Sequence, residues 1–402
     1  MTETLPAPWH RAATGANLLG SDGTLGVTIF EEMTTLAVRT GAINLGQGFP
    51  DEDGPAEIKA AAQEAIAQGS NQYAPGKGIP ELRHAISAHQ QRFYGLAPDP
   101  DTEVIVTTGA TEAIAASLMA FVGPGDEVLT FEPFYDSYGA IIGLSGATHV
   151  TAPLLAPDFM PDLAALEEAF SPRTRIVLIN NPHNPTGAVF PAEVLQRVVD
   201  LARQHDALII TDEVYEHLTF GVRHIPVATL PGAAGRTVTI SSAGKTFSFT
   251  GWKVGWLSGP EDLVSAVRTV KQFLTYSSGT PFQSAIATGL GLPDTFYEDI
   301  ALTLRKKRDI LSDGLRAAGL DVFTPQGTYF INVDTSPLGI SDSVELARRL
   351  PALVGVAAIP VPVFCHAEGA ERTKSLLRFA FCKQTAVLEE AAARLATLRE
   401  QL

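Results

Sequence analysis

Five short apolar runs rich in β-branched residues, most of them separated by helical patterns, dominate the middle of the chain. The runs lie at 103–107 (EVIVT), 127–131 (EVLTF), 175–180 (RIVLIN), 207–211 (ALIIT) and 236–241 (RTVTIS). Helical periodicity separates most of them, at about 111–122, 161–170 and 191–205. Continuous apolar strands that alternate with helices are typical of a mostly parallel sheet covered on both faces. The pattern therefore predicts an α/β fold.

The sequence on either side of these runs has a different composition and a different hydrophobic pattern. Proline and glycine are frequent in the first 30 residues, which predicts an extended arm, and helical patterns follow at 55–69 and 80–94. A long charged helical pattern covers about 290–320. Short strands and a final amphipathic helix occupy the last 80 residues. This ending predicts a smaller α+β domain.

Charge and cysteine content exclude several classes of function. The 402 residues contain 29 Lys and Arg against 44 Asp and Glu, a net charge of −15, whereas nucleic-acid and anionic membrane surfaces attract basic proteins. Cys365 and Cys382 are the only cysteines, so we expect both to be reduced and buried. Neither a signal-peptide pattern nor a run of about 18 apolar residues is present, and we expect a cytoplasmic protein.

Polar residues follow four of the predicted strands, where ligands bind in open α/β sheets. A small-residue turn at 107–113 could bind phosphate at a helix N-terminus, and 180–187 (NNPHNPTG) could hold an amide toward a ligand. An acid follows the strand at 207–211, and a lysine lies within 241–245. Each segment also has an ordinary structural explanation. In chain order these are turn geometry at 107–113, a proline-stiffened loop at 180–187, a helix N-cap for the acid and a salt bridge for the lysine.

Together these groups match the requirements of pyridoxal phosphate. That cofactor needs an amine for its aldehyde, an acid for its pyridinium nitrogen and donors for its phosphate. Lys245 or Lys253 could supply the amine, because a buried lysine loses its proton readily. Asp212 could supply the acid, and we interpret His183 as a spectator. The combination favours a pyridoxal phosphate site.

An ordered series of motifs resembles the class I aminotransferases of pyridoxal phosphate fold type I. The motifs are NLGQGFPDEDGP, NQYAPGKG, TTGATEAI, EPFYDSY, NNPHNPTG, TDEVYEHL, SSAGKTFSFTGWKVGW and RFAFCK, and the likeness extends from about Val27 to the C-terminus. It is greatest to the branch that holds kynurenine/glutamine transaminases, methionine aminotransferases and actinobacterial N-succinyldiaminopimelate aminotransferases.

The resemblance implies a two-domain homodimer. Residues 51–293 would form a large domain with a mostly parallel, seven-stranded type of sheet covered by helices. Residues 294–402 would form a smaller α+β domain, to which the N-terminal segment 1–50 contributes. The reaction implied is a ping-pong exchange of an amino group between glutamate/2-oxoglutarate and a second substrate.

The resemblance also implies roles around the cofactor ring. Lys245 would bind the cofactor aldehyde covalently and then carry a proton from the substrate α-carbon. Asp212 would pair with the pyridinium nitrogen. Asn184 and Tyr215 would hydrogen-bond the ring hydroxyl oxygen, and Tyr135 would stack on the ring.

The remaining implied roles concern phosphate and substrate. Arg378 would bind the substrate α-carboxylate through a bidentate fork, helped by Asn180, Asn184 and the Gly48 backbone N–H. The implied phosphate ligands are Ala110, Thr111, Ser242, Lys253 and, from the neighbouring subunit, Tyr73.

Two departures from the family pattern bear on the second substrate. Tyr276–Gly279 keeps an aromatic residue but lacks the histidine that follows it in human-type kynurenine enzymes. The DEDGP and YSSGTPFQ segments look more like the succinyldiaminopimelate enzymes. We therefore favour N-succinyl-2-amino-6-oxopimelate as the amino acceptor, in lysine biosynthesis, over a broad kynurenine, glutamine or methionine specificity. Lys77 and Arg39 are candidates for binding the succinyl carboxylate.

Two other functions share the same fold. A cysteine-conjugate β-lyase would use the same cofactor to eliminate a leaving group from the β-carbon. A non-catalytic regulator would carry a helix-turn-helix domain ahead of the pyridoxal phosphate fold. Fewer than 30 residues precede the motifs here, the net charge is −15 and Lys245 is present, so catalysis is expected.

Overall fold

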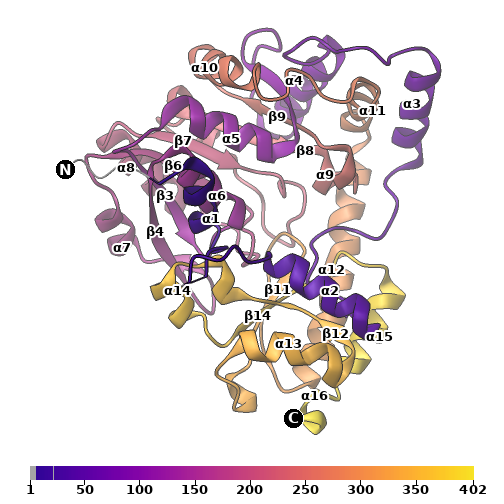
Figure 1. The fold of residues 1–402 in the computed structure, drawn as a ribbon. Coiled ribbons are helices and arrows are strands. Elements are labelled where there is room, and N and C mark those ends of the chain that lie inside the picture. The colour runs from indigo at the N-terminus through magenta and orange to yellow at the C-terminus, as the bar shows by residue number, and fades with distance from the viewer. Residues whose placement is uncertain (1–5, 21) are drawn as a thin grey trace.

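A mixed eight-stranded sheet forms the centre of the larger part of the molecule (Figure 1). The computed structural model describes residues 6–20 and 22–402. In spatial order the strands are β2 (Val104–Thr108), β9 (Val254–Ser258), β8 (Thr237–Ser242), β7 (Leu208–Asp212), β6 (Thr174–Asn180), β3 (Glu127–Glu132), β4 (Thr148–Leu155) and β5 (Met160–Pro161). The strands from β8 to β4 are parallel, whereas β9 is antiparallel to both of its neighbours and β5 is antiparallel to β4.

Helices cover both faces of this sheet because its central strands are apolar on both sides. Along β6, Ile176 and Leu178 pack into one core cluster and Val177 and Ile179 into another. Successive side chains of a strand point to opposite faces, so a continuous apolar run needs cover on both. One face carries α5 (Gly109–Phe121), α6 (Asp136–Ser145) and α10 (Glu261–Lys271), and the other carries α7 (Leu163–Ala169) and α8 (Ala192–Gln204).

A third layer packs against the β2 and β9 edge. It consists of α3 (Ala56–Ala67), α4 (Pro80–Tyr94) and α11 (Thr280–Leu290). Val104, Val106 and Trp256 of the sheet are buried together with Ile58 and Leu82 of these helices. The predicted helices at 55–69 and 80–94 are therefore present.

A four-stranded antiparallel sheet organises the smaller part of the molecule. Its strands, in spatial order, are β10 (Asp321–Phe323), β11 (Phe330–Asp334), β14 (Leu376–Ala380) and β13 (Ile359–Pro360). The helices α2 (Ile29–Thr40), α12 (Asp294–Ala317), α13 (Ser343–Val354) and α15 (Thr385–Leu395) share one core with it. The N-terminal strand β1 (Ile43–Asn44) pairs in parallel with β12 (Val356–Ala357). The α/β class with a second, smaller α+β unit is confirmed, while the boundaries at residues 50 and 293 stay a prediction.

The extended arm predicted for the first 30 residues is wrong at residues 8–15 and 29–30, which are helical, whereas residues 16–20 and 22–28 form no helix. Residues 1–5 and 21 lie outside the described residues. α1 (Pro8–Gly15) is a helix that packs against α6. A Cβ on Gly15 would lie 2.0 Å from the Gly139 carbonyl oxygen, so the approach of the two helices requires glycine. Proline at the first turn is compatible with a helix. Proline and glycine were therefore misread as signs of an extended chain.

Other boundaries differ by a few residues. α5 begins at Gly109, two residues before the predicted start, and α12 begins at Asp294 after Pro293. β4 and β9 were not predicted. Within residues 6–20 and 22–402, no helix has the length and apolar character needed to cross a membrane.

Candidate active site

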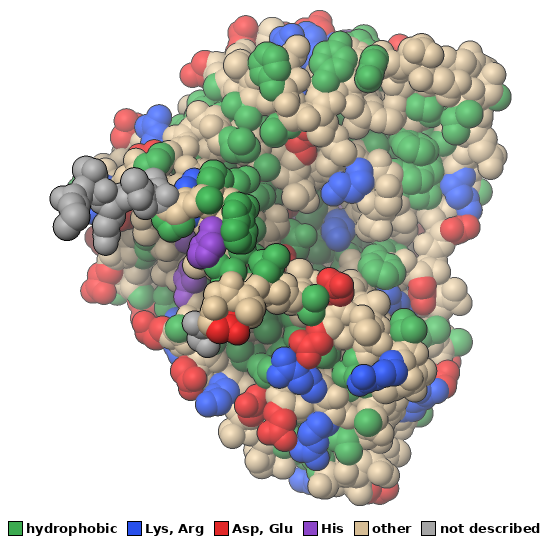
Figure 2. Space-filling model, in the orientation of Figure 1, with side chains coloured by type: hydrophobic (Ala, Val, Ile, Leu, Met, Phe, Trp, Pro, Cys, Tyr) green, Lys and Arg blue, Asp and Glu red, His purple; other side chains and the backbone are tan. Residues whose placement is uncertain are grey.

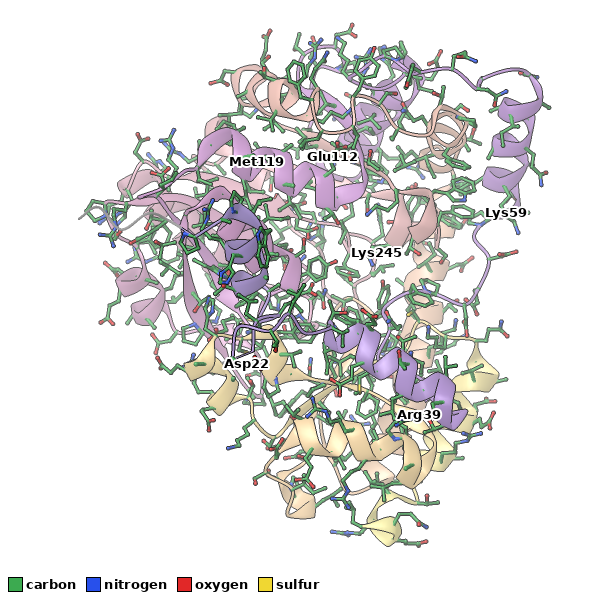
Figure 3. The ribbon with its side chains drawn as sticks, in the orientation of Figure 1. Asp22, Arg39, Lys59, Glu112, Met119 and Lys245 are labelled. Atoms are coloured by element: carbon green, nitrogen blue, oxygen red, sulfur yellow. The ribbon has the colours of Figure 1, made fainter. Side chains whose placement is uncertain are left out.

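The carboxyl ends of the parallel strands bring the predicted site residues together. Asn180 and Asp212 are register partners at the ends of β6 and β7, and Ser242 ends the adjacent strand β8. They line a cavity of about 370 Å³. Figure 2 shows a hollow in this face, at the position where Figure 3 places Lys245 between the larger and smaller parts. The predicted residues in its wall are Gly48, Ala110, Thr111, Tyr135, Asn180, Asn184, Asp212, Tyr215, Ser242, Lys245, Lys253 and Arg378.

Tyr73 is the one residue assigned a cofactor role that does not line the cavity. Its side chain is 85% exposed and contacts the Tyr276 ring edge to face, with 5.8 Å between ring centroids. Within a single chain it is a surface residue, as a residue contributed to a neighbouring subunit would be.

Asp212 is a buried acid without a cationic partner among the described residues. Tyr138 donates a hydrogen bond of 2.6 Å from its hydroxyl to Asp212 Oδ2. Burial raises the pKa of Asp212 to about 6, although the Tyr138 hydrogen bond opposes that rise. A buried carboxylate is costly unless it is paired. Asp212 therefore fits a ligand that brings its own N–H cation, as a pyridinium does.

Lys245 lies on the short helix α9 (Ala243–Thr246), directly after β8. Its Nζ donates a hydrogen bond of 3.0 Å to the Tyr329 hydroxyl oxygen. Burial lowers the pKa of Lys245, which favours the neutral amine. A neutral amine is the nucleophilic form that can attack an aldehyde.

The N-terminus of α5 forms part of the cavity wall and could bind an anion. The backbone N–H groups of its first turn have no intrahelical partner, and the helix dipole favours an anion there. Gly109 has φ of +74°, and a Cβ at this position would lie 3.2 Å from Lys253 Nζ. The lysine amine thus lies directly over the turn. Ala110, Thr111 and Ser242 also line the cavity, and their N–H and hydroxyl groups could donate to a phosphate.

Arg378 on β14 is a buried guanidinium that forms no ion pair with any described residue. It is 2% exposed, and burial lowers its pKa to about 10. Nη1 donates to Asn184 Oδ1 (3.0 Å) and Nη2 to the Gly46 carbonyl (3.1 Å), while Nε has no partner. The guanidinium carbon lies 4.1 Å from the centre of the Phe330 ring. The guanidinium is held in place by neutral acceptors, and none of the described carboxylates neutralises its positive charge. A residue that binds a substrate carboxylate would have these properties.

The two asparagines differ in the groups they leave free. Asn180 donates its amide N–H to the Asp212 carbonyl (2.8 Å) and accepts from the Asn184 backbone N–H (2.6 Å), so it also holds the loop. Asn184 directs its carbonyl oxygen to Arg378, which leaves its NH₂ group for a ligand. A Cβ on Gly48 would lie 2.5 Å from Phe330 Cζ, so a larger residue here would displace the Phe330 ring. The roles assigned to these residues stay predictions.

Sequence reasoning missed several residues at the site. Tyr138 lies three residues after Tyr135 within EPFYDSY, so that motif could have suggested it. Tyr329 directly precedes β11 and Phe330 is its first residue. No local sequence pattern indicates that either residue belongs to the site. Phe30 lines the cavity from α2, a helix that the sequence analysis does not predict. His183 does not line the cavity; it hydrogen-bonds Thr186 Oγ1, and burial lowers its pKa to about 3.

The comparison with known families decides the assignment. Residues 40–395 match the family model described as aminotransferase class I and II. The chain belongs to this family. It is therefore a transaminase whose substrates are small amino and keto acids, and the expectation of pyridoxal phosphate as cofactor is confirmed.

Individual relatives cover nearly the whole chain. A probable N-succinyldiaminopimelate aminotransferase DapC of Mycobacterium tuberculosis is 50% identical over 93% of this chain and 96% of its own. The solved structure of the N-succinyldiaminopimelate aminotransferase from that organism matches with a TM-score of 0.90 over 92% of this chain and 97% of its own. The methionine aminotransferase of Escherichia coli is 41% identical over 93% and 96% of the two chains. Human kynurenine–oxoglutarate transaminase 3 is 36% identical over 90% and 86%.

The donor set of the cavity fits pyridoxal phosphate. Bound there, the cofactor supplies an electrophilic aldehyde and an electron-accepting ring that delocalises charge from the substrate α-carbon. Asp212, Lys245 and the α5 turn lie in one cavity and offer an acid, an amine and phosphate donors. Arg378 in the same wall can orient a substrate carboxylate. These residues can therefore bind, orient and deprotonate an amino acid.

Proposed function

We propose that the enzyme transfers an amino group between glutamate and N-succinyl-2-amino-6-oxopimelate, forming N-succinyl-diaminopimelate for lysine biosynthesis. The observation that carries this proposal is the 50% identity, over 93% of the chain, to a relative named for that reaction. The DEDGP and YSSGTPFQ segments favour the same substrate.

A broad-range transaminase for methionine, kynurenine or glutamine is the second candidate. Relatives with methionine and kynurenine activities in their names are 41% and 36% identical. The cations that line the cavity within the described part of the chain are Lys245, Lys253 and Arg378, which already have proposed partners. Lys77 and Arg39, the candidates for the succinyl carboxylate, do not line this cavity. Lys77 donates a hydrogen bond to the Asp101 carbonyl, and Figure 3 shows Arg39 on α2, away from Lys245. The cavity of one chain therefore offers no further cation, among the described residues, for the succinyl carboxylate of the favoured substrate. This observation favours the broad-range candidate.

A comparison of amino donors separates the two candidates. The purified enzyme, loaded with pyridoxal phosphate, is assayed with 2-oxoglutarate and either N-succinyl-diaminopimelate, kynurenine, methionine or glutamine. We expect kcat/KM to be at least about 100-fold higher for the succinylated donor, or about 2.7 kcal/mol of transition-state discrimination. Comparable values for methionine or kynurenine would replace the proposal with the broad-range activity. Pyruvate release from a cysteine conjugate would reveal a β-lyase.

The proposed site roles follow the geometry of the cavity. Asp212, held by Tyr138, pairs with the cofactor ring nitrogen, and Lys245 binds the aldehyde and carries the proton. Arg378 binds the substrate carboxylate. Asn184 and Tyr215 bond the ring hydroxyl oxygen, Tyr135 stacks on the ring, Asn180 and Gly48 assist Arg378, and Ala110, Thr111, Ser242 and Lys253 bind phosphate.

We also propose that the active unit is a homodimer in which Tyr73 reaches the phosphate of the neighbouring subunit. Phe273 is 85% exposed, and Tyr276 and Leu274 nearby are also exposed. Lys271 Nζ donates to the Gly76 and Tyr276 carbonyls and so ties the two exposed loops together. A cluster of exposed aromatic side chains beside Tyr73 is typical of an interaction surface.

Mixed dimers test whether Tyr73 acts in the neighbouring subunit. Tyr73→Phe and Lys245→Ala proteins are mixed in equal amounts, unfolded and refolded together, and assayed at limiting pyridoxal phosphate. Each mixed dimer would contain one intact site, so random pairing should restore about a quarter of the wild-type activity. The separately refolded variants are the control. No gain over their summed activity would mean that Tyr73 serves its own subunit or no site at all.

A further inference from the structure

A hydrogen-bonded chain runs from the Lys245 amine through Tyr329 to the Gly48 backbone. Lys245 Nζ lies 3.0 Å from the Tyr329 hydroxyl oxygen, and that hydroxyl lies 2.5 Å from the Gly48 carbonyl oxygen. Lys245 comes from α9 beside the large sheet, Tyr329 from the residue before β11 of the small sheet, and Gly48 from the loop after β1. Three distant segments of the chain therefore meet at one phenol.

The direction of these hydrogen bonds is determined by the groups themselves. Burial raises the pKa of Tyr329 well above its usual value, so its oxygen keeps a proton. The Gly48 carbonyl can only accept, and the single hydroxyl proton of Tyr329 therefore points to it. The phenol oxygen has only acceptor capacity left for Lys245. A neutral Lys245 amine must consequently direct one N–H to Tyr329, so its lone pair points away from the phenol oxygen.

We propose that Tyr329 is a positioning residue that holds the Lys245 amine whenever the amine is not bonded to the cofactor. In this position the amine lone pair faces the cavity and can take the proton from the substrate α-carbon. The inference rests on the proposed role of Lys245. The same phenol holds the Gly48 peptide, whose N–H is proposed to assist the substrate carboxylate, so it aligns the base and the substrate together.

Within the part of the chain that the structure describes, Lys245 Nζ has no hydrogen-bond acceptor other than Tyr329. The Tyr215 ring lies 5.7 Å from Nζ. Lys245 also lines a second cavity, of about 450 Å³, whose wall includes Tyr329 and Cys382. Without the phenol, the freed amine could rotate toward that cavity and away from the substrate.

The pH dependence of the amine gives a readout that a purely structural role would not change. A phenol oxygen accepts a stronger hydrogen bond from an ammonium than from an amine, so its removal should lower the pKa of Lys245. The ionisable groups that act on Lys245 from the surrounding elements are Cys382, Asp212, Arg378 and Lys253, and all of them stay in place.

The test uses Tyr329→Phe, which removes only the hydroxyl. Apoprotein is mixed with pyridoxal phosphate between pH 5 and 10, reduced with borohydride, and the modified lysine is identified and quantified by mass spectrometry. We expect the pH midpoint of covalent bonding to fall by about half to one pH unit. In steady-state assays kcat should fall about 10- to 100-fold, because a misplaced base loses its near-attack geometry. Affinity for pyridoxamine phosphate, which has no aldehyde, should be unchanged and shows that the variant is folded.

A matched control is Tyr297→Phe, which removes another buried phenol. Tyr297 donates to the Gly289 and Leu290 carbonyls, outside the main cavity. It should change neither the midpoint nor kcat. An unchanged midpoint in Tyr329→Phe, with or without a loss of kcat, would overturn the inference. If borohydride instead trapped the cofactor of the wild-type protein on another lysine, the role of Lys245 itself would fail.

Discussion

Replacing Lys245 with alanine should reduce transaminase turnover by at least about 10,000-fold, because it removes both the covalent attachment of the cofactor and the base for the α-carbon proton. The proposed phosphate site and Asp212 are untouched by this change, so the variant should still bind pyridoxal phosphate without a covalent bond. The measurement is the initial rate with 2-oxoglutarate, together with the cofactor content after gel filtration.

Two further measurements show which property of Lys245 matters. Lys245→Arg keeps a positive charge but cannot act as a base near neutral pH, so it should be as inactive as the alanine variant. Added methylamine should restore part of the turnover of Lys245→Ala, because a small amine fits the volume that the side chain vacates. Turnover of Lys245→Ala within tenfold of wild type would refute the assignment of this lysine.

Replacing Arg378 with alanine should lower kcat/KM for amino-acid substrates by about 30-fold to several thousand-fold. The guanidinium is buried and has an unpartnered Nε, so a bound carboxylate forms a desolvated charge pair with it. Truncating one member of such a pair costs about 2–5 kcal/mol. Most of the loss should appear in KM, measured by varying the amino donor at saturating 2-oxoglutarate.

The matched variant Arg378→Lys separates charge from geometry. A lysine retains the charge but loses the planar fork, so it should recover only part of the lost kcat/KM. Affinity for pyridoxal phosphate should change little in either variant, because Lys253 and the α5 turn form the proposed phosphate site. An unchanged KM for the amino donor in Arg378→Ala would remove Arg378 from the substrate site.

The errors in the sequence-based description have local causes. The arm was misread because Pro8 and Gly15 are common both in extended segments and at helix ends. Whether this segment forms a helix depends on its packing against α6, where Gly15 and Gly139 approach closely. β9 is antiparallel in a mostly parallel sheet, and the pattern of apolar runs carries no signal for strand direction.

Some cavity residues could be predicted from the sequence, whereas the residues that hold them in place could not. Asp212, Lys245 and the α5 turn were predicted because each follows an apolar run, and parallel strands end at one edge of a sheet. The Tyr138–Asp212 and Tyr329–Lys245 hydrogen bonds join residues 74 and 84 positions apart. Neither pair has a periodic or spacing signature.

By itself the sequence determined the α/β class, the family and the chemical groups of the site, because these depend on local patterns of apolar, small and charged residues. Only the tertiary structure decided which groups hold those residues in place. It placed Tyr138 against the acid, Tyr329 against the amine, and Phe30 and Phe330 in the wall beside Arg378. Such contacts arise from the packing of two sheets and the N-terminal helices around one cavity, and packing is a property of the whole chain.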